Sequence, residues 1–183
     1  MSAAVELLKH RFTVDAFHAM AASGGLDADA RLELIDGEVY RMAPIGNRHA
    51  LLTNLLTEWL IEQRAPGTSI SPQNPLVLDD HTELYPDLCV LALPHAALRT
   101  RLPKAADALL VIEIADSSVQ TDRHIKLPRY LAAGIPEVWL VDLLGRLLEV
   151  HRPGLGPEQH CSGRVSAGKA QACVDVDQLF EGW

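Results

Sequence analysis

Cysteine is scarce in this sequence, and its pattern excludes the common zinc and disulfide arrangements. The three cysteines, Cys89, Cys161 and Cys173, form no C-x-x-C pair, and their odd number favours reduced thiols. The eight histidines are scattered, without an H-E-x-x-H motif, and no serine or cysteine lies in a nucleophile elbow. A zinc site and a covalent triad are therefore not expected, and oxygen ligands are favoured for any metal.

Long apolar runs and targeting signals are also missing. No hydrophobic stretch approaches the roughly 18 residues that a membrane-spanning helix needs. The first residues, MSAAVELLKHRF, contain neither the apolar core nor the cleavage site of a secretory signal. We therefore expect a cytoplasmic protein that does not contact membranes.

Positive charge is in deficit, with 16 lysines and arginines against 24 acidic residues and a net charge of −8. This balance argues against a simple nucleic-acid-binding protein, because lysine and arginine supply most of the affinity for phosphates. Three basic residues nevertheless cluster in the connector 94–107, namely Arg99, Arg101 and Lys104. They are candidates for contacting nucleic acid along a groove, although a solvated loop is the ordinary interpretation of such a segment.

The order of the predicted elements is typical of an α/β protein. A chain of 183 residues, of which 48% are hydrophobic, favours one domain over residues 1–183. The pattern predicts a short helix that begins at Thr13, strands at 31–36 and 38–43 around Asp36-Gly37, a helix at 49–64, strands at 68–71, 75–79, 137–142 and 146–152, and a helix at 122–133 with a kink at Pro128. The apolar stripe predicted for the long helix consists of Leu51, Leu52, Leu55, Leu56, Trp59 and Leu60. We expect a mixed β-sheet with the two longer helices packed on it.

Two carboxylates lie inside apolar runs that read as buried strands. Asp87 occurs in LYPDLCVLAL, and Glu113 occurs in LLVIEIAD. Burying a carboxylate is unfavourable unless a cation or strong hydrogen-bond donors accompany it. A hard divalent cation between the two strands would stabilise both groups. The alternatives are that Asp87 enters its strand with a solvated side chain and that Glu113 is a paired core carboxylate.

These residues are part of a longer pattern that resembles a known family. The order PD, a Glu inside a hydrophobic strand, D-x-x-x-K and then Y-x-x-x-G-I-P-E-V-W-L-V-D resembles the Uma-type restriction endonuclease family, a branch of the PD-(D/E)XK nuclease superfamily. The block RLELIDGEVYRMAP followed by His49 is similar to the opening of that family. The resemblance covers about residues 12–152, and residues 153–183 form a C-terminal extension.

The resemblance implies which residues form the site. The superfamily motif has a lysine two residues after the glutamate, where this sequence has Ala115. In this branch the lysine has moved to the following helix, which makes Lys126 its replacement. The implied catalytic residues are therefore Glu33, Asp87, Glu113 and Lys126.

The resemblance also implies a restriction-endonuclease-like fold and an activity. The expected protein is a metal-dependent endonuclease that hydrolyses phosphodiester bonds of DNA with Mg²⁺ or Mn²⁺. Asp87 and Glu113 would hold the metal, while Glu33 would bind a second ion or accept a proton. Lys126 would orient the attacking water or stabilise charge on the phosphate. His49 at its helix start is a candidate phosphate contact, with a surface histidine as the alternative.

Two further expectations concern partners and function class. We expect a homodimer, because a small acidic domain has little surface with which to hold a duplex, and two-fold symmetry matches the symmetry of DNA. The alternative function is that of a non-catalytic nucleic-acid-associated or scaffold protein that retains the nuclease fold. The acidic charge and the displaced lysine favour this alternative.

Overall fold

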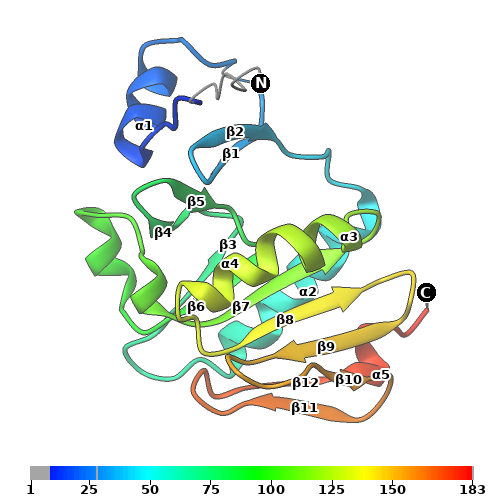
Figure 1. Ribbon diagram of the computed structural model, residues 1–183. Helices are drawn as coiled ribbons and strands as arrows, with labels where there is room; N and C mark the ends of the chain where they lie inside the picture. The colour runs from blue at the N-terminus through cyan, green and yellow to red at the C-terminus, as the bar shows by residue number, and fades with distance from the viewer. Residues whose placement is uncertain (1–8, 28, 183) are drawn as a thin grey trace.

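A six-stranded mixed sheet lies at the centre of the protein, for which a computed structural model describes residues 9–27 and 29–182 (Figure 1). The strand order is β10-β9-β8-β7-β6-β3. These strands are β3 (Ser69–Pro72), β6 (Leu88–Leu91), β7 (Ala108–Ala115), β8 (Val138–Asp142), β9 (Leu147–His151) and β10 (Glu158–His160). Only β7 and β8 pair in parallel among these neighbours, so a helical crossover must join them.

A smaller sheet with the order β2-β1-β5-β4 lies beside the first one. Its strands are β1 (Leu32–Ile35), β2 (Glu38–Arg41), β4 (Leu76–Asp79) and β5 (Thr82–Leu84). The predicted hairpin is confirmed: Asp36 and Gly37 both have positive φ, 51° and 79°, as a two-residue turn of this kind requires. Helix α1 (Val14–Ala22) lies next to this sheet, and the Thr13 hydroxyl caps it by accepting a hydrogen bond from the N–H of Ala16.

Helix α2 (Asn47–Glu62) covers one face of the six-stranded sheet. Leu52, Leu56 and Leu60 belong to one hydrophobic core with residues of the sheet and of the C-terminal elements. Those elements are β11 (Arg164–Ala167), β12 (Ala172–Asp175) and α5 (Val176–Leu179). The prediction that Leu51 belongs to the buried stripe is wrong, since its side chain is 52% exposed. Residues spaced by four face the sheet, and Leu51 is turned about 100° away from Leu52 toward solvent.

The opposite face of the sheet carries the crossover between β7 and β8. This crossover consists of α3 (Val119–Thr121), the π-helical turn η3 (Asp122–Lys126) and α4 (Leu127–Ala132). Side chains alternate along β7: Ile112 and Ile114 belong to the core beneath α2, whereas Val111 belongs to the core beneath α4. Glu113 shares the face of Val111, so the sheet directs its carboxylate toward the crossover.

The crossover differs from the single kinked helix that the sequence predicts. The N–H of Leu127 bonds to the carbonyl of Asp122, five residues back, which widens the turn just before Pro128. Proline lacks the N–H that a regular turn would use, and this accounts for an irregularity at that point. As a result both Asp122 and Lys126 are buried.

Two short helices replace the loop expected between β6 and β7. They are η1 (His95–Arg99) and η2 (Ala105–Asp107). The predicted mixed sheet flanked by helices is confirmed. None of the helices within the described residues is long and apolar enough to cross a membrane.

Candidate active site

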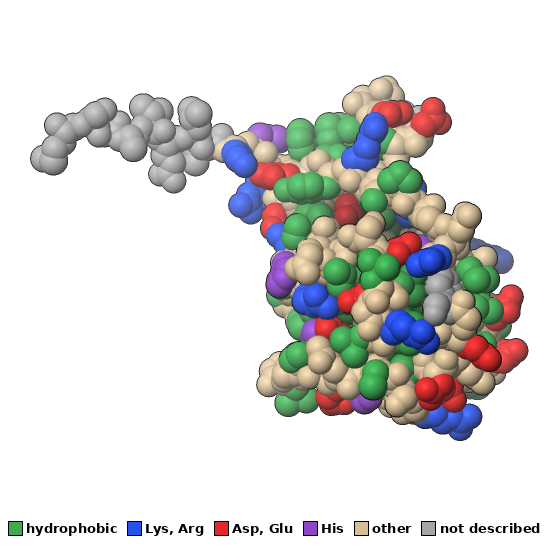
Figure 2. Space-filling model, turned by 90° about the vertical axis from the view of Figure 1, so that its right-hand side faces the viewer, with side chains coloured by type: hydrophobic (Ala, Val, Ile, Leu, Met, Phe, Trp, Pro, Cys, Tyr) green, Lys and Arg blue, Asp and Glu red, His purple; other side chains and the backbone are tan. Residues whose placement is uncertain are grey.

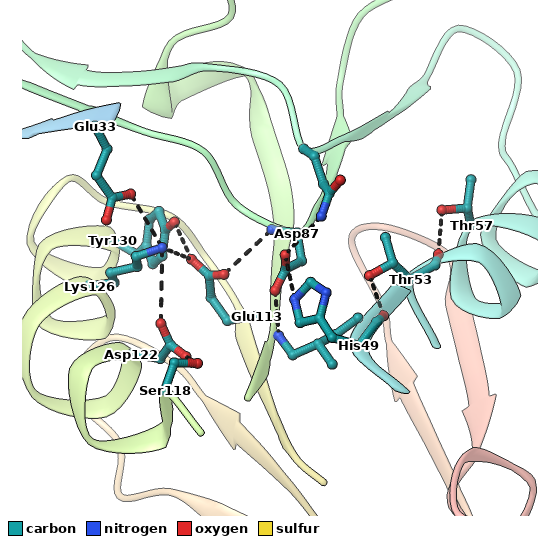
Figure 3. Close-up of polar contacts among 12 residues, drawn as sticks. Glu33, His49, Thr53, Thr57, Asp87, Glu113, Ser118, Asp122, Lys126 and Tyr130 are labelled. Atoms are coloured by element: carbon teal, nitrogen blue, oxygen red, sulfur yellow. Dashed lines mark hydrogen bonds and ion pairs between the residues drawn. The ribbon is translucent and has the colours of Figure 1, made fainter. Parts of the chain in front are cut away.

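A pocket of about 590 Å³ opens where β1, the start of α2, the end of β7 and the crossover meet. All four residues expected to form the site line this pocket: Glu33, Asp87, Glu113 and Lys126. Figure 3 shows their polar contacts continuing from Glu33 through Lys126 and Glu113 to Asp87 and His49. The structure therefore brings together side chains that are far apart in the sequence.

Asp87 and Glu113 are neighbours because their strands pair. Leu88 pairs with Ile112, so the residue before β6 lies beside the residue near the end of β7. The Asp87 N–H donates a 3.4 Å hydrogen bond to Glu113 Oε2, and Asp87 Oδ2 accepts a 2.8 Å bond from the N–H of Ile114. Both side chains are buried. Two adjacent carboxylates with little access to water are thus built into the sheet.

The burial of Glu113 changes its acidity. Burial raises the pKa of the Glu113 carboxyl well above its usual range, the Lys126 ammonium opposes this shift, and the negative charge of Asp87 adds to it. Ionising the pair is therefore unfavourable unless more positive charge is present. A cation bound beside the pair would relieve this cost.

Lys126 supplies part of that positive charge. Its Nζ lies 3.3 Å from Glu33 Oε2, 3.6 Å from Glu113 Oε1 and 4.0 Å from Asp122 Oδ1. The side chain is only 8% exposed. Burial alone would disfavour the ammonium, but the surrounding carboxylates outweigh burial and raise the pKa of Lys126. Lys126 is therefore a buried cation beside the carboxylates, although it comes from the crossover and not from the strand position of Ala115.

Glu33 lies on the far side of this ammonium from Glu113 (Figure 3). Its Oε2 makes the ion pair with Lys126 but no hydrogen bond to any residue within 9–27 and 29–182. The structure thus places Glu33 as a partner of the lysine, and its role in binding a second ion or accepting a proton stays a prediction. In this arrangement Glu33 holds the ammonium in place.

Tyr130 is a site residue that the sequence interpretation missed. Its hydroxyl donates a 2.6 Å hydrogen bond to Glu113 Oε1, and its side chain is fully buried. Burial and the charge of Glu113 raise the pKa of the phenol, so it remains a neutral donor. The available signal was its position four residues after Lys126, which puts both side chains on one face of a helix.

His49 contacts a carboxylate in this structure. It lies in the first turn of α2, and its Nε2 is 2.9 Å from Asp87 Oδ1. The Nδ1 atom is buried and has no hydrogen-bond partner in the described part of the chain. The sequence suggested a phosphate contact for this residue, and that role stays a prediction. The observed geometry makes His49 a residue that positions Asp87.

The basic connector lies at the other end of the strands. Leu91 pairs with Ala108 where β6 and β7 leave the connector, whereas Asp87 and Glu113 lie at the opposite end of that pair. Arg101 forms two hydrogen bonds to Asp107, of 2.6 and 2.8 Å. The structure therefore does not bring Arg99, Arg101 and Lys104 to the pocket, and nucleic-acid contact through them stays a prediction.

Other arginines line the pocket instead. They are Arg31, Arg41 and Arg129. They are scattered along the sequence, so no local charge cluster indicated them. On the face drawn in Figure 2, basic, acidic and hydrophobic side chains are interspersed.

The donor set fits a hard divalent cation. In the described part of the chain, Glu113 Oε2 accepts only the long hydrogen bond from Asp87, which leaves it available as a ligand. No group of three or more His, Cys, Asp or Glu side chains among the described residues is arranged to hold a metal ion. An ion bound by the two carboxylates would complete its coordination with water or phosphate oxygens, as Mg²⁺ commonly does.

Glu113→Gln is expected to leave the metal-free protein as stable as the wild type at neutral pH, or more stable. The folded-state pKa of Glu113 is raised, so its contribution to stability is fully present below the usual value of 4.5 and is lost as pH rises through the folded-state pKa. Glutamine cannot ionise, so the Tm difference should grow in the variant's favour from acidic to neutral pH. Thermal melts in EDTA from about pH 4 to pH 8 measure this.

Glu149→Gln is the control for that experiment. The Tm difference between this variant and the wild type should change with pH in the opposite direction. Burial opposes ionisation of Glu149, but hydrogen bonds from Arg123 and His151 outweigh burial and lower its pKa. Its contribution to stability is therefore present above the unfolded value and is lost as pH falls through the folded-state pKa. A wild type that is clearly more stable than Glu113→Gln at pH 7 would show that Glu113 is a structural hydrogen-bond partner.

Comparisons with known proteins agree with this architecture. No functionally curated protein shows significant sequence similarity to the chain. A crystal structure of "a putative nuclease belonging to DUF820 from Anabaena variabilis ATCC 29413" matches with a TM-score of 0.73 and 16% identity, over 92% of this chain and 97% of that chain. This likeness confirms the predicted nuclease-type fold. Residues 14–174 match the family described as "Uma2: Putative restriction endonuclease", and the chain belongs to that family.

Proposed function

We propose that the protein is a metal-dependent endonuclease that hydrolyses phosphodiester bonds of DNA. The observation that carries the proposal is the buried pair Asp87 and Glu113 with the Lys126 ammonium 3.6 Å from Glu113. Two carboxylates and a lysine in one pocket are the groups needed to hold a cation and to contact a phosphate. Membership of the family described as "Putative restriction endonuclease" supports the choice of DNA as substrate.

The residues of the pocket have distinct roles in this proposal. Asp87 and Glu113 would hold Mg²⁺ or Mn²⁺, which when bound polarises the phosphate and lowers the pKa of water. Tyr130 and His49 fix the orientation of these two carboxylates through the contacts at 2.6 and 2.9 Å. The Lys126 ammonium donates to a phosphate oxygen or to the attacking water, and so stabilises the charge that develops in the transition state. Glu33 orients that ammonium.

A cleavage assay on several nucleic-acid forms tests the proposal. Supercoiled plasmid, linear duplex, single-stranded DNA and single-stranded RNA are incubated with Mg²⁺, with Mn²⁺ or with EDTA. We expect cleavage of DNA with either ion and none with EDTA, because the carboxylate pair requires the cation. If RNA alone is cleaved, the proposed substrate class is wrong. If none of the nucleic acids is cleaved under any condition, the proposed hydrolysis is wrong.

A non-catalytic role is the second candidate, favoured by the net charge of −8 and by the neutralisation of Glu113 by Lys126. In that case the lysine would replace the metal as a permanent counter-ion. The Tm would then be the same with Mn²⁺ and with EDTA, since a ligand that does not bind the folded state does not stabilise it. A rise in Tm with Mn²⁺ that Glu113→Gln abolishes would contradict the replacement of the metal by Lys126, and cleavage in the assay above would exclude a non-catalytic role.

We also propose a homodimer, because one small acidic domain has little surface with which to hold DNA. Sedimentation velocity at micromolar concentration distinguishes a dimer from a monomer.

A further inference from the structure

A second pocket, of about 680 Å³, lies between α1 and the β1–β2 hairpin. It adjoins the site, since Arg31 and Met42 line both pockets. No residue of the proposed cation site lines it. The volume is within the range of pockets that hold small molecules, and it leaves room for a nucleotide-sized group.

The lining of this second pocket combines apolar surface with a few polar groups. The apolar part comes mainly from α1 and the neighbouring strand: Phe17, Ala21, Ala22, Leu26 and Leu32. The polar lining residues are His18, Asp27, Arg31, Gln73 and Tyr85. A flat aromatic ring with hydrogen-bonding edges, such as a nucleobase, matches this combination.

Tyr85 lines the pocket, and a hydrogen bond holds its hydroxyl in place. Its hydroxyl donates a 3.1 Å hydrogen bond to Glu83 Oε1, and His18 Nε2 lies 2.9 Å from Glu83 Oε2. Glu83 is fully buried. A tyrosine ring whose hydroxyl is fixed in this way loses little conformational freedom when a base stacks on it.

Gln73 links the second pocket to the carboxylates. It has the left-handed backbone conformation, with φ of 50°, which is unusual for a residue other than glycine. Its Nε2 lies 3.5 Å from Asp87 Oδ1, and its N–H donates to the Asp87 carbonyl. The turn thus directs an amide to the boundary between the two pockets.

Arg31 stands at the same boundary. No hydrogen bond or ion pair joins its guanidinium to another side chain in the part of the chain that the structure describes. A cation between the two pockets is placed to bind the phosphate that connects a nucleoside in one pocket to a reacting group in the other.

We propose that the second pocket binds the base of an unpaired nucleotide next to the phosphate that is cleaved. The inference rests on the proposed nuclease function and adds the substrate class, namely a single strand or an extrahelical nucleotide. A net charge of −8 limits the affinity that phosphate contacts can supply, so burial of a base supplies the remainder. A base paired in a duplex cannot enter a pocket behind a hairpin without leaving the stack.

Binding in EDTA tests this inference separately from hydrolysis. The probes are fluorescein-labelled single-stranded oligothymidylate, an abasic strand with the same number of phosphates, and a duplex of oligothymidylate with oligoadenylate. Fluorescence anisotropy should show about tenfold tighter binding of the thymidylate than of the abasic strand, the size expected for stacking one base. The duplex should bind no more tightly than the abasic strand.

Matched tryptophan substitutions on α1 locate the effect. Ala21→Trp fills the pocket and should reduce the preference for bases to less than about twofold, since the ring occupies the space of the base. Ala19→Trp makes the same change at an exposed position of the helix that does not line the pocket, and it should keep the full preference. Ala22→Trp is a second pocket-filling variant in case the first does not fold.

The possible outcomes separate the inference from the proposed function. Equal binding of the thymidylate and abasic strands, or an unchanged preference in both pocket-filling variants, overturns the inference even if the wild type cleaves DNA. A preference for bases that only the pocket-filling variants lose supports the subsite even if no cleavage is found with Mg²⁺ or Mn²⁺.

Discussion

Lys126→Ala is expected to reduce the rate of DNA cleavage by about 10² to 10⁴, the usual effect of losing one positioned catalytic group. The reason is geometric: the ammonium lies 3.6 Å from Glu113 and is buried at the pocket where the phosphate would bind. Single-turnover rates at saturating Mn²⁺ measure the effect on the chemical step. Lys169→Ala removes an exposed lysine far along the chain and is expected to cleave at the wild-type rate.

The same substitution also tests the structural role of the lysine. Removing Lys126 leaves Glu33, Glu113 and Asp122 without the cation that they surround. The metal-free variant should therefore melt at a lower temperature, because a buried charge without its partner is strongly destabilising. Rates must be compared below the Tm of the variant. A variant that is folded and cleaves as fast as the wild type would refute the catalytic role.

A relocated lysine provides the rescue experiment. Ala115 and Glu113 share a face of β7, so a lysine at position 115 would extend toward the same pocket. The double variant Lys126→Ala with Ala115→Lys should regain part of the lost rate. Ala115 is fully buried, so the gain will be limited by the room available for a longer side chain.

Asp87→Asn and Glu113→Gln are each expected to abolish both cleavage and the stabilisation by Mn²⁺. The two carboxylates are the adjacent oxygen donors of the pocket, and an amide is a much weaker ligand for a hard cation than a carboxylate is. In the wild type, a free ion concentration of 100 times Kd should stabilise the fold by about 2.7 kcal/mol. Differential scanning calorimetry with Mn²⁺ and with EDTA measures the shift in each variant.

A matched control separates ligand loss from a general loss of negative charge. Glu62→Gln removes one carboxylate at an exposed position near the end of α2, outside the pocket. Its Tm shift with Mn²⁺ should equal that of the wild type. If Asp87→Asn and Glu113→Gln keep the shift as well, the ion binds elsewhere and the assignment of the pair as ligands is wrong.

The parts of this structure that follow from the sequence are those governed by local rules. Asp36-Gly37 predicts its hairpin because few other residue pairs adopt positive φ in succession. Glu113 stood out because a carboxylate in an apolar strand requires compensation, whatever the rest of the fold is. Alternation along β7 then directs it to the same side as Val111.

The parts that could not be predicted depend on how separate elements meet. Whether Glu33 contacts the lysine or the carboxylates is decided by where β1 lies relative to the crossover, and no sequence spacing encodes that. Tyr130 looks like an ordinary core aromatic until the structure shows its hydroxyl at Glu113. The basic connector joins the two strands that carry the site carboxylates, which suggested that it could lie along the site. Because β6 and β7 are antiparallel, the connector lies at one end of the strand pair and both carboxylates lie at the other end.

The buried ammonium of Lys126 has a consequence for how the site is assembled. Many small metal-binding domains need their ion in order to fold, so that chelation unfolds the protein. Here the cation that holds Glu33 and Glu113 together belongs to the chain itself. The pocket is therefore formed before any ion arrives, and removal of the metal should abolish cleavage while the protein, although less stable, remains folded.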